Sequence, residues 1–139
     1  MLYAAGVGIP GLLSSTAPGA PELRSEFQPQ PGEIVATEHW GSSGFANTDL
    51  ELQLKKHGID KLIVIGLIAH TCVEATVRYA AELGYEVTMV KDATASYTQE
   101  HMHAALEINI PNYASAVVTT QEIVDALSSK KRTVSAKKS

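Results

Sequence analysis

The single cysteine of this chain, Cys72, lies where a strand-like run gives way to a helix-like one. Residues 61–67 are almost wholly apolar, and apolar residues then recur at helical spacing over 73–81. A thiol at the start of a helix lies near unpaired backbone N–H groups and the positive end of the helix dipole, and both favour the thiolate. The same N–H groups can hold the oxyanion that forms when sulfur attacks a carbonyl carbon. The placement therefore predicts a nucleophile, although a lone cysteine is more commonly a small buried hydrophobe.

Alternating strand-like and helix-like segments position this cysteine. The expected strands are 34–37, 61–67, 86–90 and 116–118. The expected helices follow Thr48 up to Gly58, span about 73–83, run from Thr98 to about 109, and run from Thr119 to about 127. Thr48 with Glu51, and Thr119 with Glu122, have the spacing of capping boxes. This order predicts βαβ crossovers and a three-layer αβα fold with a mainly parallel, Rossmann-like sheet.

Four strands are few for such a sheet, and the chain begins as though a first strand and helix were missing. Residues 1–32 hold most of the prolines and no clean periodicity, so we expect an irregular N-terminal segment. Residues 33–128 form the expected folded domain, and 129–139 a basic flexible tail. The sheet is then completed by the N-terminal segment, by a partner, or not at all.

Composition narrows the classes of function. The chain has 139 residues, 45% hydrophobic and 19% charged, which is an ordinary balance for one globular domain. A net charge of −4 gives no reason to expect binding to nucleic acid or to an anionic membrane. No segment reaches the ~20 apolar residues of a membrane-spanning helix. One cysteine allows no intramolecular disulfide, which favours a reducing, cytoplasmic location.

The segment around Cys72 resembles the nucleophile region of the isochorismatase-like cysteine hydrolases. The matching residues are Gly66, Ala69, His70, Cys72, Val73, Glu74, Ala75, Thr76, Arg78 and Ala80. Further blocks agree in the same order at 31–35, 44–50, 57–59, 84–85, 92–95 and 119–123, so that the resemblance covers about residues 21–127.

The resemblance implies a mechanism. Cys72 would attack an amide or similar carbonyl to give a thioester, which water then hydrolyses. The backbone N–H groups of Cys72 and Ile68 would form the oxyanion hole, and the peptide bond between Leu67 and Ile68 would be cis.

Two residues of the family's catalytic set have no counterpart here. The family's aspartate base belongs to the first strand, and no aspartate precedes Asp49, which we interpret as a cap or dipole residue of a helix. The family's lysine aligns with Thr37 when Trp40 anchors the alignment. It aligns with His39 when the anchor is Phe45 instead. The imidazole of His39 could substitute as the base for the thiol, or it is ordinary surface.

Aromatic and imidazole side chains could form the substrate pocket. Trp40 and Phe45 flank a glycine- and serine-rich loop, where they would stack against a substrate or serve as core anchors. His70 would line the same pocket. His101 and His103 have a spacing that points them to different faces of a helix, so we expect no joint metal site there. We also expect no cofactor.

Three hypotheses of function remain. The first is a cysteine-dependent hydrolase of small-molecule amide or related carbonyl bonds, whose partners are its substrate and further copies of itself. The second is a truncated, catalytically impaired or inactive family member that acts through binding or oligomerisation. The third and weakest is isochorismate hydrolysis, which needs the acidic residue that is missing.

Overall fold

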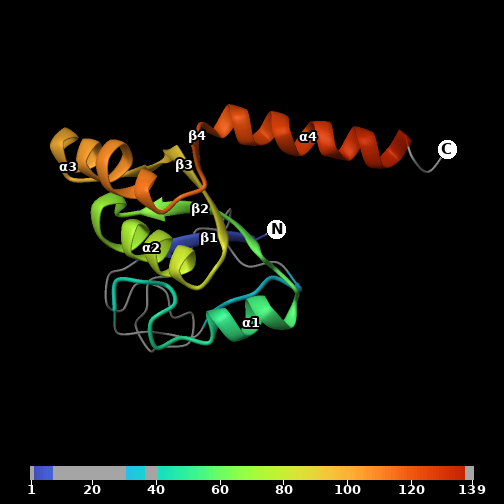
Figure 1. Cartoon of the computed structure of the whole chain (residues 1–139), viewed down its shortest axis with the longest axis horizontal. Coiled ribbons are helices and arrows are strands. Elements are labelled where there is room, and N and C mark those ends of the chain that lie inside the picture. Colours follow the sequence, from blue (N-terminus) through green and yellow to red (C-terminus); the bar gives the residue numbers. More distant parts are fainter. Residues whose placement is uncertain (1, 8–30, 37–40, 137–139) are drawn as a thin grey trace.

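A computed structural model describes residues 2–7, 31–36 and 41–136, with side chains described over 31–36 and 41–129. Four parallel strands form one sheet in the order β1-β2-β3-β4 (Figure 1). The strands are β1 (Leu2–Val7), β2 (Lys61–Leu67), β3 (Glu86–Ala95) and β4 (Ala116–Val118). The helices are α1 (Leu50–Lys56), α2 (Glu74–Glu82), α3 (Gln99–His103) and α4 (Thr120–Ala136). A π-helical turn, Ala69–Val73, joins β2 to α2, and a second one, Ala104–Asn109, continues α3.

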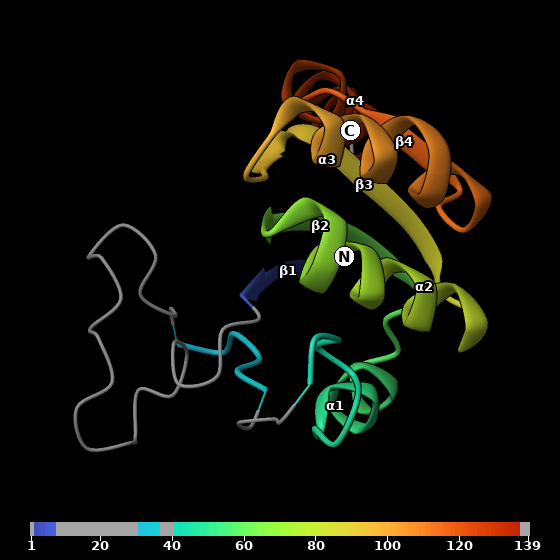
Figure 2. The same ribbon diagram turned by 90° about the vertical axis from the view of Figure 1, so that its left-hand side faces the viewer.

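Successive side chains of each strand point to opposite faces of the sheet, and both faces carry buried apolar residues. Leu62 and Val64 of β2 join one apolar cluster with Val77 of α2 and Ile110. Figure 2 shows α2 and α3 on this same side of the sheet. Ile63 alternates with Leu62 and Val64 along β2, and it is only 4% exposed. The predicted three-layer fold with a parallel sheet is confirmed.

The first strand comes from the N-terminal segment that we expected to be irregular, so this expectation is wrong for residues 2–7. β1 pairs with β2 in parallel, from Leu2 beside Leu62 to Val7 beside Leu67. Local periodicity gave no signal because a short apolar run becomes a strand only when a neighbouring edge accepts it. Of the three ways to complete the sheet, the structure therefore shows the first.

The strand expected at 34–37 is wrong over its described part, since residues 33–36 have no strand pairing. Ile34 and Ala36 instead pack against the edge of the apolar cluster. Both sides of β2 are already occupied, by β1 and β3. The apolar character of this segment therefore reflects packing and not pairing.

Two elements are longer than predicted. β3 continues to Ala95 through an irregularity in register, so that Thr94 pairs with Gly66. α4 continues to Ala136, and the tail that we expected to be flexible is helical up to that residue. Residues 128–136 contain neither glycine nor proline, the two residue types that most strongly end a helix.

Of the two predicted capping boxes, one is confirmed and the other is wrong. The Thr119–Glu122 box is formed, because Thr119 N–H donates to Glu122 Oε2 (2.7 Å) and Glu122 N–H donates to Thr119 Oγ1 (3.3 Å). The Thr48 hydroxyl accepts from Leu50 N–H (3.2 Å), but Glu51 pairs with Lys55 instead of closing the box. Within the described residues, no helix is long and apolar enough to cross a membrane.

Candidate active site

Cys72 lies in the turn that connects β2 to α2, at the carboxyl edge of the sheet. Its side chain is 2% exposed, and the sulfur lies 3.3 Å from Thr71 Oγ1. The helical backbone begins at Ala69 and not at Cys72 as expected, because Thr71 and Val73 both donate their N–H groups to the carbonyl of Ile68 (3.2 Å each). The thiol therefore occupies the first, π-helical turn.

The peptide bond between Leu67 and Ile68 is cis, as the family resemblance implies. Ile68 itself has an extended backbone (φ −103°, ψ 140°) and immediately precedes the turn that holds Cys72. The role of its N–H group as an oxyanion donor stays a prediction.

Two residues of the recognised motif, Glu74 and Arg78, form a structural link. Glu74 Oε1 accepts from Arg78 Nη2 (2.6 Å), and its other oxygen accepts from Asn109 Nδ2 (3.2 Å). The Arg78 guanidinium donates to Tyr113 OH (3.0 Å) and lies 4.6 Å from the centre of that ring. These contacts hold α2 against the segment that follows α3.

His70 is packed into a small cluster of rings. Its Nδ1 hydrogen-bonds with Ser96 Oγ, and its ring stacks on that of His101 (4.2 Å between centroids, 14° between planes). Tyr97, which is 73% exposed, meets the His70 ring edge-on at 5.7 Å. Sequence reasoning missed the contact between His70 and His101, because nothing in the local pattern links the turn to α3.

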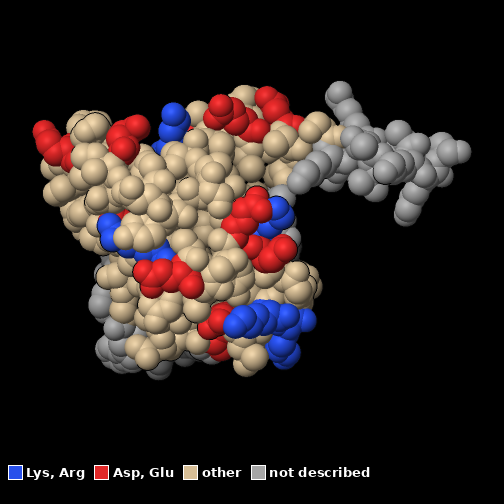
Figure 3. Space-filling view, in the orientation of Figure 1, with Lys and Arg blue, Asp and Glu red and all other residues tan. Residues whose placement is uncertain are grey.

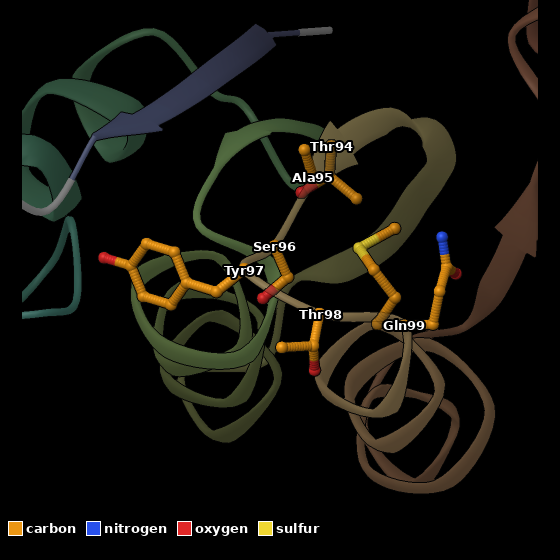
Figure 4. A pocket seen from close by; sticks show the side chains of 7 residues that line it. Thr94, Ala95, Ser96, Tyr97, Thr98 and Gln99 are labelled. Carbon is orange, nitrogen blue, oxygen red and sulfur yellow. The ribbon is translucent and has the colours of Figure 1, made fainter.

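A cavity of about 350 Å³ lies at the carboxyl end of β3 beside this cluster (Figure 4). Its walls are formed by Thr94, Ala95, Ser96, Tyr97, Thr98, Gln99 and Met102. A second cavity, of about 340 Å³, lies between β4 and the segment after α3. Cys72 is not part of the wall of either cavity.

The remaining predicted site residues divide into two groups. Phe45 is 6% exposed and stacks with Tyr79 (6.2 Å between centroids, 5° between planes), so its contacts are those of a core anchor. Thr37, His39 and Trp40 lie outside the described residues.

Two carboxylates beside the start of α4, Asp92 of β3 and Glu122 of α4 itself, have lowered pKa values. Asp92 Oδ1 accepts from Thr120 Oγ1 (2.9 Å) and Thr120 N–H (2.7 Å), and the hydrogen bond from the hydroxyl is the main cause that lowers the pKa of Asp92. The pKa of Glu122 is also lowered, mainly by the N–H of Thr119. Both bonds favour the ionised form.

The described residues contain no group of three or more His, Cys, Asp or Glu side chains that could hold a metal ion. On the face shown in Figure 3, acidic and basic side chains are interspersed and form no extended basic surface.

Comparison with known proteins agrees with this geometry. The isochorismatase domain family matches residues 14–122, which is most of the chain, and the chain therefore belongs to the isochorismatase family. An isochorismatase family protein of unknown function, YddQ of Bacillus subtilis, is 35% identical over 109 residues, which cover 72% of this chain and 60% of YddQ. The ureidoacrylate amidohydrolase RutB of Pantoea ananatis is 35% identical over 106 residues, which cover 76% of this chain and 42% of RutB.

A crystal structure has the same fold. The isochorismatase-like hydrolase from Alkaliphilus metalliredigens superposes with a TM-score of 0.70 at 32% identity, covering 76% of this chain and 57% of that protein. The matched region thus spans 60% or less of the length of each of these relatives.

Proposed function

We propose that this protein hydrolyses an amide or related carbonyl bond of a small molecule, with Cys72 as the nucleophile. The observation that carries the proposal is the position of Cys72 in the turn that connects the carboxyl end of β2 to α2. Loops at the carboxyl ends of parallel strands are where open α/β sheets bind their ligands. The family of the chain, and the amidohydrolase RutB among its relatives, support hydrolysis of a C–N bond.

The proposed reaction proceeds in two steps. The thiolate sulfur of Cys72 bonds to the carbonyl carbon, and the N–H groups of Cys72 and Ile68 stabilise the resulting oxyanion. The C–N bond then breaks, and the leaving nitrogen takes up the proton that the base received from the thiol. Water attacks the thioester, which releases the acid and restores the thiol. The proposed base is His39. Thr37 stands at the position of the family's lysine when Trp40 anchors the alignment.

The substrate pocket would lie at the same carboxyl edge of the sheet as Cys72. His70 would line it from the turn that holds Cys72, and Trp40 would contribute a ring from the loop before α1. Phe45 would not contact the substrate, and it would support the loop by stacking with Tyr79 in the core. We also propose a cytoplasmic protein that forms homo-oligomers and needs no cofactor.

A second candidate function is binding or association without turnover. One observation favours it, the 2% exposure of Cys72. A substrate can reach the sulfur only if the surrounding segments open, and a thiol that stays sealed would be a core residue.

Turnover of a panel of small primary amides, ureido compounds and imides distinguishes the two candidates. Wild-type protein should release ammonia or amine from at least one compound. Cys72→Ala should abolish the release, whereas Glu51→Gln, which changes an exposed ion pair on α1, should not alter it. Unchanged turnover in Cys72→Ala would exclude the nucleophile. The absence of turnover in wild type, together with self-association, would favour the second candidate.

A further inference from the structure

Thr76 is a buried threonine whose hydroxyl joins two distant segments of the chain. It is 2% exposed. Its Oγ1 donates to the carbonyl of Cys72 (2.7 Å) and accepts from the N–H of Gly44 (3.0 Å). A bond from a threonine to the carbonyl four residues earlier is common in helices. The bond from Gly44 is not part of any helix, and it connects the turn of Cys72 to the loop before α1.

That loop, residues 41–48, is held at several points. The carbonyl of Gly44 accepts from Thr48 Oγ1 (2.8 Å), so both polar groups of this residue are bonded. Phe45 N–H donates to Ser43 Oγ (3.1 Å), and the Phe45 ring packs on Tyr79 of α2. Among the contacts described for this loop, the Gly44 bond to Thr76 is the polar one that reaches α2.

The two partners of Thr76 belong to different segments, and one of them is the proposed nucleophile. The accepting carbonyl belongs to Cys72 itself. The hydrogen bond therefore restrains the backbone of the residue that carries the proposed nucleophile. The donating N–H belongs to Gly44, in the loop that precedes α1. A single hydroxyl therefore connects the loop 41–48 to the backbone of the nucleophile.

We propose that Thr76 is a positioning residue that holds the loop 41–48 in register with Cys72. This inference rests on the proposed function. Thr76 does not touch the reacting atoms, and it acts through the backbone of Cys72 and Gly44. Its effect requires a hydroxyl, because only a group that both donates and accepts can make the two bonds.

The test uses Thr76→Val, which keeps the shape and removes the hydroxyl, and Thr76→Ser, which keeps the hydroxyl. Thr119→Val is the matched control, because the Thr119 hydroxyl also donates and accepts but lies after β4, two strands away in the sheet. Two measurements are made on each folded variant, the hydrogen exchange of the Gly44 amide and the rate at which iodoacetamide alkylates Cys72 at neutral pH.

The expected result is a slow Gly44 exchange in wild type, Thr76→Ser and Thr119→Val, and a fast one in Thr76→Val. Alkylation of Cys72 should fall roughly tenfold in Thr76→Val and stay within roughly threefold of wild type in the other two. Where a substrate is known, Thr76→Val should lower kcat more than it raises KM, because positioning acts on the reacting groups.

Separate outcomes would overturn the two proposals. If Cys72 of wild type reacts no faster than free cysteine, the proposed function fails and the role of Thr76 fails with it. If wild type reacts faster than free cysteine but Thr76→Val reacts at the same rate, only the role of Thr76 is wrong. A Gly44 amide that exchanges freely in wild type would also overturn this role, without any variant.

Discussion

The rings of His70 and His101 stack with 4.2 Å between their centroids and 14° between their planes. His70 belongs to the turn that holds Cys72, whereas His101 belongs to α3, so the stack connects two elements that are distant in sequence. Ser96 adds a hydrogen bond to His70 Nδ1 from the loop after β3. The orientation of the His70 ring within the nucleophile turn is thus set by residues outside the recognised motif.

His101→Ala should weaken this connection, while His101→Phe should preserve it because a flat ring remains. A stacked ring pair contributes about 0.5–1.5 kcal/mol beyond its buried area, so we expect His101→Ala to lower the free energy of unfolding by about 1 kcal/mol or more. Urea unfolding at neutral pH measures the difference. Equal losses in the two variants would show that the ring contact contributes nothing.

Glu74 should be important for stability and not for chemistry. Its side chain is only 12% exposed and accepts from both Arg78 and Asn109, so Glu74→Ala leaves two donors without an acceptor. The expected loss in the free energy of unfolding is about 1–3 kcal/mol. Glu51→Ala removes an exposed partner of Lys55 and should cost less than about 1 kcal/mol. A loss for Glu74→Ala no greater than for Glu51→Ala in urea unfolding would contradict this assignment.

Acid should weaken the start of α4. The pKa values of Asp92 and Glu122 are lower in the folded chain than their ordinary values, and the hydrogen bonds from Thr120 and Thr119 are the causes. Groups of this kind stabilise the fold fully above their unfolded pKa values, about 4 for both, and lose that contribution as the pH falls through the folded values. We expect the urea midpoint to decrease from about pH 5 downward.

The variants Asp92→Asn and Glu122→Gln test this assignment. They should have lower midpoints than wild type at neutral pH and a shallower decrease in acid, because the titrating group is absent. A decrease in acid as steep as in wild type in both variants would place the acid sensitivity elsewhere.

Patterns that depend on neighbours in sequence were predicted well. The buried strand before Cys72, the cis bond at Ile68 and the capping box at Thr119 all follow from local residue order or from a motif. The helix before Gly58 also ended where a glycine with positive φ allows it (φ 62°).

Patterns that depend on distant partners were not predicted. The strand at Leu2–Val7 exists because it pairs with the edge of β2. Residues 34–36 form no strand, since β1 and β3 already occupy both edges of β2. The stack of His101 on His70 and the bond from Gly44 to Thr76 join residues far apart in sequence. Local periodicity has no information on such pairs, since they form only when the elements pack.

The central claim concerns the reactivity of one sulfur that is 2% exposed. The chain has a single cysteine, so alkylation of native protein with iodoacetamide, read by mass spectrometry, reports on Cys72 alone. We predict complete labelling at neutral pH, at a rate above that of free cysteine measured alongside. Labelling that occurs only in denaturant would contradict the account, because it would show a sulfur that belongs to the core.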